Sequence, residues 1–248
     1  MNLPEILTIV SKIAKDMNSL CYITGGTPRD KVMGKLSNID DIDLTSGDKN
    51  IHYIAKEASI KLKSENMSYK VLDDGHAQIT IGDFKLDFSS NFNIPNIKNI
   101  LDKAGLKGSS EMQQELYSRD FTCNTLLMTL DLKQILDPTG LALKDIKDKK
   151  LRTCLPAAIT LGYDNKRVVR ILYMAAKLGF DVDEEIIEWV KENPQTISNC
   201  TQAYLIKKLG KAISYNKNTT VSLLDKMGLW KYIPPMKELQ ALMTPERL

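Results

Sequence analysis

Residues 24–45 read TGGTPRDKVMGKLSNIDDIDLT, and the other segments of the chain can be placed around this stretch. The apolar run at 20–23, separated from the two glycines only by Thr24, predicts a buried strand. Asp41 and Asp43 alternate with apolar residues in a second predicted strand. Because residues i and i+2 of a strand point to the same face, the two carboxylates project together while the apolar side chains face the core.

The two carboxylates predict a metal site. Adjacent like charges are costly unless a cation lies between them. Mg²⁺ is typically held by one or two carboxylates and completed by substrate phosphates. Gly25 and Gly26 allow the backbone to approach a bulky anion, and the N-terminus of the following predicted helix favours phosphate. The stretch therefore predicts metal-dependent phosphoryl or nucleotidyl transfer.

Composition narrows the class of protein. The 248 residues can form one large domain or two small ones. With 43% hydrophobic and 26% charged residues the chain is ordinary for a globular protein, and its net charge of +3 permits a nucleic-acid partner without requiring one. Arginine is scarce among the 34 basic residues, so we expect it where a planar, bidentate donor is needed. The six arginines are Arg29, Arg119, Arg152, Arg167, Arg170 and Arg247.

The cysteines and the apolar segments bear on the compartment. Cys21, Cys123, Cys154 and Cys200 are far apart and form no CxxC pair, which argues against a zinc site and for reduced thiols. No run of 18 apolar residues predicts a membrane span, and the N-terminus lacks the apolar segment of a signal peptide. We therefore expect a cytoplasmic protein with no membrane partner.

The first part of the chain mixes helical and alternating patterns. The predicted helices are 3–17, a short one from Arg29 to Gly34, and 50–63, and the predicted strands are 68–72, 78–82 and 84–90. In the last strand Asp87 falls on the polar face, where a third carboxylate can join the pair at 41 and 43.

Two later segments complete this part. Residues 91–110 are rich in Asn, Lys and Gly and predict a mobile loop. Residues 111–130 predict one helix in which Arg119, Asp120 and Asn124 cluster. Positions 120 and 124 are four apart, so they share a helix face.

Beyond about residue 141 the pattern is wholly helical, which predicts two domains, 1–140 and 141–248. The most informative segment, DNKRVVRILYMAAKLGF at 164–180, predicts a helix that ends at Gly179. Asp164, Arg167 and Arg170 form one stripe along it. The stripe suits a binding surface, and an ion-paired, solvated helix face is the alternative.

In order and spacing, these motifs resemble those of the class II CCA-adding enzymes and bacterial poly(A) polymerases, part of the polymerase-β-like nucleotidyltransferases. The resemblance covers about residues 20 to 180, with a looser similarity to about 235. The motifs are GGTPRDKVMG at 25–34, DIDLT at 41–45, LDFSS at 86–90, SRDFTCNT at 118–125, DPTG at 137–140 with Asp145-Ile146 and Leu151-Arg152, and YDNKRVVR at 163–170 ending in LGF at 178–180.

The resemblance implies an α+β fold: a polymerase-β-like head with a mixed sheet, followed by an all-helical neck and a partial body. It implies a template-independent enzyme that adds CMP and AMP from CTP and ATP to the 3′ end of tRNA, with two Mg²⁺ ions and release of pyrophosphate.

The resemblance also implies roles for residues. Asp41 and Asp43 are the implied metal ligands, with Asp87 as a third catalytic carboxylate. Gly26 and Arg29 are implied at the nucleotide phosphates, and Gly25 and Asp30 are also implied in nucleotide binding. The remaining implied contacts are Arg119, Asp120 and Asn124 at the ribose, Asp164 and Arg167 at the base edge, and Arg170 at the triphosphate.

Two alternatives remain open at this point. Family members continue into further helical modules, whereas this chain stops near the start of the body, which keeps open a poly(A)-polymerase-like or partial (CC- or A-adding) enzyme acting on other RNA. An RNA-binding module without catalysis is the other alternative. Tyr163 and Tyr173 stand where the family has Glu and a third Arg, which bears on base selection.

Overall fold

The computed structural model describes residues 1–36, 39–72, 75–89 and 93–235. It divides into two compact units, Met1–Ile146 and Lys147–Leu248, called unit 1 and unit 2 below. Ser90 of the LDFSS motif and the first two residues of the predicted loop at 91–110 lie outside the described residues.

Unit 1 is built on a mixed sheet, as predicted. Its described strands follow the order β3-β4-β5-β2-β1-β6-β7, in which β2 and β5 are parallel and the other neighbours are antiparallel. The strands are β1 (Tyr22–Thr24), β2 (Asp41–Thr45), β3 (Met67–Val71), β4 (Ala77–Ile81), β5 (Phe84–Phe88), β6 (Leu127–Met128) and β7 (Ile135–Leu136).

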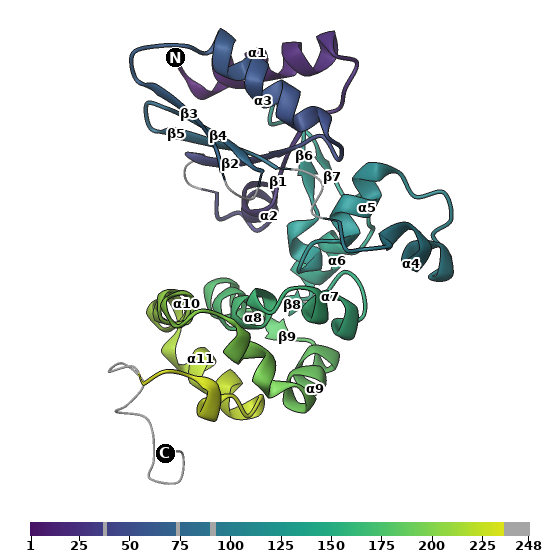
Figure 1. Cartoon of the computed structure of the whole chain (residues 1–248), viewed down its shortest axis with the longest axis vertical. Coiled ribbons are helices and arrows are strands. Elements are labelled where there is room, and N and C mark those ends of the chain that lie inside the picture. Colours follow the sequence, from purple (N-terminus) through teal and green to yellow (C-terminus); the bar gives the residue numbers. More distant parts are fainter. Residues whose placement is uncertain (37–38, 73–74, 90–92, 236–248) are drawn as a thin grey trace. The chain divides into compact units, whose positions relative to one another are not determined.

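Two amphipathic helices, α1 (Leu3–Asp16) and α3 (Asn50–Lys61), cover one face of this sheet (Figure 1). The α1 helix starts at a capping box in which Asn2 and Glu5 satisfy each other's backbone N–H groups. The apolar sides of the helices and strands form one core, and each large side chain buried there stabilises the fold by about 1.5–3 kcal/mol. Its fully buried members include Ile6, Val10, Ile23, Ile42, Leu44, Ile54, Ile79, Leu86 and Phe88.

Two predictions for unit 1 were wrong. The segment after residue 92 is not a plain loop, because it contains the helix α4 (Ile97–Lys103). The long helix predicted over 111–130 ends early: α5 spans only Glu111–Tyr117, and the 3₁₀ turn η1 (Thr122–Asn124) leads into β6. The carboxylate of Asp120 accepts a hydrogen bond from the backbone N–H of Phe121, a local bond that competes with the helix.

The short predicted helix after the glycines also differs from expectation. The α2 helix spans Gly26–Val32, so it starts three residues before Arg29 and has only seven residues. Its last turn leads to Gly34, whose φ of +66° is the left-handed conformation expected of a helix-terminating glycine.

Unit 2 is mainly helical, with α8 packed against α10 and α11. The prediction that it lacks strands was wrong, because β8 (Lys150–Leu151) and β9 (Asp181–Val182) form a two-residue parallel pair. Both tryptophans lie in this unit, Trp189 in α9 and Trp230 at the start of η3 (Trp230–Tyr232). The helices are α6 (Ala142–Lys147, at the division), α7 (Ala157–Tyr163), α8 (Lys166–Leu178), α9 (Glu184–Glu192), η2 (Pro194–Asn199), α10 (Gln202–Tyr215) and α11 (Lys217–Lys226).

The four cysteines are free, as predicted. Burial raises the pKa of the Cys21 and Cys123 thiols to about 12. In the part of the chain that the structure describes, no helix is both long and apolar enough to cross a membrane.

Candidate functional site

The parallel pairing of β2 with β5 brings three carboxylates to one face of the unit 1 sheet. Asp43 lies directly opposite Asp87, and Asp41 lies opposite Lys85. Alternation keeps Ile42 buried while the carboxylates share the other face, as the sequence predicted. The structure therefore brings Asp87 next to the Asp41–Asp43 pair.

A lysine lies among these carboxylates. The Lys85 Nζ donates to Asp41 Oδ1 at 3.0 Å and forms a second ion pair with Asp87. Burial disfavours the charge of Lys85, but its hydrogen bonds to Asp87 and Asp41 outweigh that effect and raise its pKa. A second hydrogen bond to Asp87 comes from Gln78 Nε2, at 2.7 Å from Oδ1.

The surroundings of Asp43 disfavour the ionised form of its carboxyl. Burial raises the pKa of its carboxyl, the nearby charges of Asp87 and Asp41 raise it further, and Arg119 and Lys85 oppose the rise. A carboxyl with this surrounding is most easily ionised when a cation lies beside it.

Gly25 packs directly against Asp43. A Cβ placed on Gly25 would lie 2.6 Å from Asp43 Oδ2, and the φ of +71° at Gly25 also favours glycine. Gly25, the first glycine of the pair, thus makes room for the Asp43 carboxylate. The sequence predicted such a close approach of the backbone to an anionic ligand. Gly26 is less constrained, since its Cβ would meet only Arg29 Nη2 at 3.4 Å.

A buried polar network lies beside this group. The Arg29 guanidinium, 3% exposed, donates from Nη1 to Asn124 Oδ1 at 2.7 Å and from Nε to Asp30 Oδ1 at 2.8 Å. Asn124 Nδ2 in turn donates to Asp120 Oδ1 at 3.0 Å. Asp120 and Asn124 therefore meet as predicted, but through a turn and not along a helix face.

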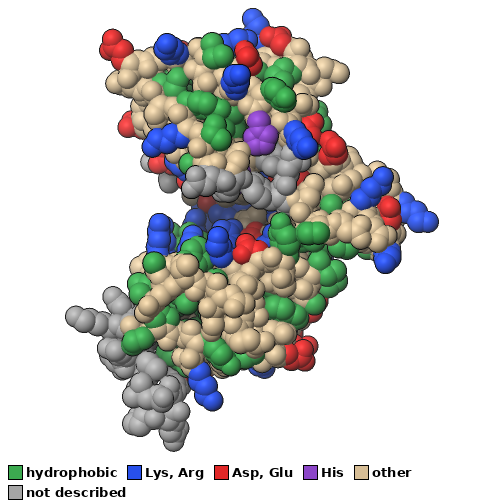
Figure 2. Space-filling model, viewed as in Figure 1, with side chains coloured by type: hydrophobic (Ala, Val, Ile, Leu, Met, Phe, Trp, Pro, Cys, Tyr) green, Lys and Arg blue, Asp and Glu red, His purple; other side chains and the backbone are tan. Residues whose placement is uncertain are grey.

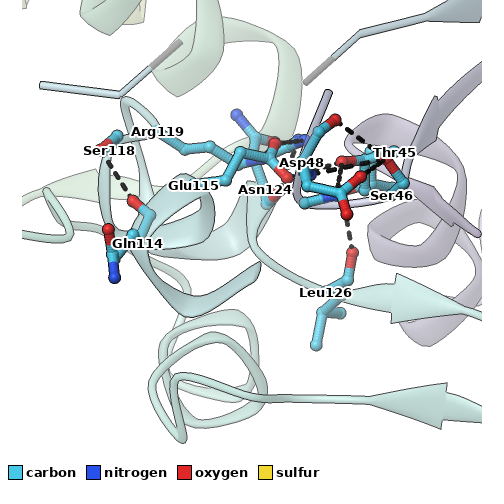
Figure 3. Close-up of polar contacts among 11 residues, drawn as sticks. Thr45, Ser46, Asp48, Gln114, Glu115, Ser118, Arg119, Asn124 and Leu126 are labelled. Atoms are coloured by element: carbon cyan, nitrogen blue, oxygen red, sulfur yellow. Dashed lines mark hydrogen bonds and ion pairs between the residues drawn. The ribbon is translucent and has the colours of Figure 1, made fainter. Parts of the chain in front are cut away.

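A second set of hydrogen bonds and ion pairs connects Thr45, at the end of β2, to Arg119 through Glu115, and Figure 3 shows these contacts. Arg119 Nη2 lies 2.5 Å from Glu115 Oε1, and Thr45 Oγ1 donates to Glu115 Oε2 at 2.6 Å. Arg119 Nη1 also donates to the backbone oxygen of Asn124 at 3.3 Å. Burial works against the charge of Arg119, but the Glu115 carboxylate outweighs it and raises the pKa of the guanidinium.

Sequence reasoning missed Glu115 and Lys85. Glu115 precedes Arg119 by four residues in a predicted helix, and this spacing could have predicted their i,i+4 ion pair. Lys85 precedes Asp87 by two residues in a predicted strand, which places both on one face. Only the register with β2 brings Lys85 to Asp41.

The remaining predicted residues lie in unit 2. The prediction that Asp164 lies on the same helix as Arg167 and Arg170 was wrong, because Asp164 is an extended residue at the end of α7 and α8 starts only at Lys166. The Asp164 carboxylate accepts from the backbone N–H of Lys166 at 3.0 Å. Arg167 is buried; its guanidinium lies 5.4 Å from the ring centroid of Tyr163 and donates to the backbone oxygen of Thr160 at 3.3 Å. Arg170 is half-buried on the same helix.

The chemistry of the carboxylate group fits a divalent cation. Its donors are hard oxygens, and the positive charge of Lys85 already lies between two of them. Within the described residues no three His, Cys, Asp or Glu side chains are close enough as they stand to hold one metal ion. A site of one or two carboxylates completed by a phosphate ligand does not need three.

The chain is similar to a known protein family and to several known proteins. Residues 21–152 match the family described as the poly(A) polymerase head domain. The CC-adding tRNA nucleotidyltransferase of Shouchella clausii is 25% identical over 193 residues, which cover 77% of this chain and 44% of that protein. The CCA-adding enzyme of Streptococcus uberis is 24% identical over 254 aligned residues, covering 97% of this chain and 57% of that enzyme.

Solved structures agree in fold. A tRNA nucleotidyltransferase complexed with a primer tRNA and an incoming ATP analog superposes with a TM-score of 0.69 at 25% identity, over 90% of this chain and 62% of that one. The chain spans about half the length of the two curated relatives named above. The polymerase-β-like α+β fold predicted from the motifs is thereby confirmed.

Proposed function

The chain belongs to the poly(A) polymerase head-domain family, and from this premise we propose that it is a template-independent RNA nucleotidyltransferase. The proposed reaction adds CMP and AMP, from CTP and ATP, to the 3′ end of tRNA and releases pyrophosphate. The observation that carries the proposal is the convergence of Asp41, Asp43 and Asp87 beside the network of Arg29, Asp120 and Asn124.

Asp41 and Asp43 would hold the metal, with Asp87 as the third carboxylate, and we propose two Mg²⁺ ions. When bound, such ions activate the RNA 3′-hydroxyl and neutralise the triphosphate. In the reaction the 3′-oxygen forms a bond to the α-phosphorus of the nucleotide, and the bond between the α-phosphorus and the oxygen leading to pyrophosphate breaks.

The polar network supplies positioning. The Asp120 carboxylate and the Asn124 amide, fixed through Arg29, offer an acceptor and donors suited to ribose hydroxyls. Arg119, held by Glu115, keeps a positive charge near Asp43. Preorganised groups of this kind lower a barrier without reorganising during the reaction.

The nucleotide base would be read by Asp164 and Arg167, whose acceptor and donor groups suit the edges of C and A. Protein side chains, and not a nucleic-acid template, would then choose the nucleotide. Substituting either residue is expected to reduce the discrimination between CTP and ATP more than the rate with a single nucleotide. Unchanged discrimination in a folded variant would favour the ion-paired helix face.

One assay tests the function. The protein is incubated with Mg²⁺ and labelled tRNAs that end at the discriminator base, at CC or at CCA, and with an unstructured RNA, with CTP and ATP supplied singly and together. We expect incorporation of C and then A that stops at CCA. The Shouchella clausii relative is described as CC-adding, so arrest after CC would support a partial enzyme.

Other outcomes separate the remaining alternatives. Unlimited addition of A to the unstructured RNA would favour a poly(A)-polymerase-like enzyme. RNA binding without any incorporation would favour a non-catalytic module. Asp41→Ala and Asp43→Ala are expected to abolish incorporation, whereas Asp83→Ala, in the exposed turn before β5, is the matched control. Full activity in either of the first two variants would exclude the metal assignment.

A further inference from the structure

Unit 1 contains a buried carboxylate that the proposed reaction does not use. Figure 2 shows Asp and Glu side chains at the surface, where water solvates their charge. Among the described residues the buried acids are Glu115, Asp120 and Asp145, and Asp145, at 2% exposed, is the most deeply buried of them. Glu115 pairs with Arg119, and Asp120 belongs to the proposed ribose contact. The burial of Asp145 therefore needs an explanation of its own.

Asp145 lies in α6 and accepts a hydrogen bond from the 3₁₀ turn η1. Thr122 Oγ1 donates to Asp145 Oδ2 at 2.7 Å, and the Thr122 side chain is fully buried. The two residues are 23 positions apart, so the bond joins separate segments of the chain. Because a buried carboxylate is costly unless it is hydrogen-bonded, this contact favours one position of the turn relative to α6.

The DPTG segment at 137–140 contacts the other end of the same turn. Thr125, directly after η1, shares a hydrogen bond of 3.1 Å between hydroxyl oxygens with Thr139. Thr139 Oγ1 donates to Asp137 Oδ1 at 3.0 Å, and the backbone oxygen of Thr139 accepts from the Tyr117 hydroxyl at 3.3 Å. Both ends of η1 are thus attached to the segment that runs from the DPTG motif into α6.

The residues proposed to contact the ribose lie on this turn or directly before it. Thr122 is two residues after Asp120 and two residues before Asn124, and the side chains of Asp120 and Asn124 are joined by a hydrogen bond of 3.0 Å. A shift of Thr122 therefore moves both ribose-contacting side chains through the backbone. Misplacement of a substrate-positioning group by about 1 Å can cost about 100-fold in rate.

We propose that Asp145 is a positioning residue: through Thr122 it fixes Asp120 and Asn124, and thereby the selection of ribonucleotides over deoxyribonucleotides. A site built to hydrogen-bond a substrate hydroxyl rejects the analogue that lacks it, because its own polar groups are then left unpaired. Such rejection requires donors and acceptors that cannot move to suit either sugar. The inference rests on the proposed function and gives the DPTG and Asp145 segment a task in it.

Incorporation of a single nucleotide is measured with CTP and with dCTP, on a tRNA that ends at the discriminator base. Thr122→Val replaces the hydroxyl by a methyl group of similar size, so Asp145 loses this donor. We expect the ratio of kcat/KM for CTP to that for dCTP to fall about tenfold, mainly through a higher KM for CTP. Thr122→Ser keeps the hydroxyl and should retain the ratio.

Thr220→Val in unit 2 is the matched control. Thr220 is also fully buried, and its hydroxyl donates to the backbone oxygen of Asn216 at 2.8 Å. Each substitution removes one buried hydroxyl and its hydrogen bond, so both should lower the thermal midpoint, but only Thr122→Val should change the sugar ratio. Equal changes of the ratio in the two variants, or an unchanged ratio in folded Thr122→Val, would overturn the proposal.

Asp145→Asn tests the carboxylate itself. Its amide oxygen can still accept from Thr122 but carries no charge, so the ratio should fall less than in Thr122→Val. Adding Asp145→Asn to Thr122→Val should lower the ratio no further, whereas additive losses would mean that the two residues act independently and would overturn the coupling. Circular dichroism identifies an unfolded variant, and Thr125→Val, at the other end of the turn, then replaces it.

A binding measurement separates this inference from the proposed function. The affinities for CTP and dCTP are determined by isothermal titration calorimetry in Mg²⁺ without RNA. If wild type incorporates nucleotides with a sugar preference that Thr122→Val keeps, only this inference fails. If wild type incorporates nothing but binds CTP more tightly than dCTP, and Thr122→Val loses that preference, the inference stands and the catalytic proposal fails. A wild type that treats the two sugars alike would overturn the inference.

Discussion

Gly25 leaves no room for a side chain beside the Asp43 carboxylate. Gly25→Ala places a methyl group 2.6 Å from Asp43 Oδ2 at a φ of +71°, so the carboxylate must move. A displacement of about 1 Å at a reacting centre can cost about 100-fold in rate, and we expect a loss of that size in nucleotide incorporation.

Gly34→Ala is the matched control for this substitution. Gly34 has a similar φ of +66° but no atom within 4 Å of its Cβ position. It should lose about 1–2 kcal/mol of unfolding free energy from backbone strain and keep its rate at saturating substrate. Equal losses of activity in the two variants would show that strain, and not the approach to Asp43, is responsible.

Lys85 forms ion pairs with both Asp41 and Asp87. Lys85→Met leaves Asp41 and Asp87 without this cation, so we expect a lower thermal midpoint in EDTA. Because Lys85 is 39% exposed, the loss should be small, about 1 kcal/mol or less.

The same variant should respond more strongly to a divalent cation. Added Mg²⁺ no longer has to displace an ammonium group, so it should raise the midpoint of Lys85→Met more than that of wild type. Thermal unfolding with and without Mg²⁺ measures both effects, and Lys70→Met on β3 is the control. A smaller Mg²⁺ response in Lys85→Met would contradict this interpretation.

Glu115 is expected to act through Arg119. Glu115 is buried and the Arg119 side chain is 19% exposed, so Glu115→Gln leaves a largely desolvated guanidinium without its carboxylate and should cost about 3 kcal/mol of unfolding free energy. In a double-mutant cycle with Arg119→Met, the second substitution should cost much less once the first is made. Additive losses in urea unfolding would mean that the two side chains are not energetically coupled.

The sequence predicted the positions of the three carboxylates better than it predicted the side chains that contact them. Alternation placed Asp41, Asp43 and Asp87 on polar strand faces, and the structure agrees. The roles of Lys85 and Glu115 depend on strand register and on Thr45, 70 positions from Glu115, which no local pattern encodes. The metal and nucleotide roles of these residues stay predictions.

Among the elements, strongly periodic segments were predicted well and mixed ones were not. The α1, α3 and α8 helices and strands β3 to β5 appear within a few residues of their predicted bounds. The second half of the segment 111–130 contains the short apolar run Leu126-Leu127-Met128, and an apolar run alone does not distinguish a buried helix from a buried strand. Pairing of Met128 with Ile23 decides in favour of the strand.

The α8 helix ends at a glycine, Gly179. Gly179 caps the helix with a φ of +71° and has no atom within 4 Å of its Cβ position. Gly179→Ala should therefore cost about 1–2 kcal/mol of unfolding free energy. Gly162→Ala, within α7 and equally open, should be neutral or stabilising because alanine favours a helix. Denaturant unfolding of the two variants provides the comparison.

The whole molecule consists of two compact units, and we expect these to unfold separately. Unit 1 holds the carboxylate group and its own core, so Leu86→Ala should destabilise it by about 2–5 kcal/mol. The helices of unit 2 pack around α8, remote in sequence from this substitution.

Both tryptophans, Trp189 and Trp230, belong to unit 2, so the indole fluorescence of the protein is a built-in label for that unit alone. In Leu86→Ala the transition followed by far-ultraviolet circular dichroism should broaden toward lower denaturant while the fluorescence transition keeps its midpoint. Equal shifts of both signals would mean that the units unfold as one. Quenching of the same emission on adding RNA would report, without any attached dye, on events in the unit that carries α8 and α10.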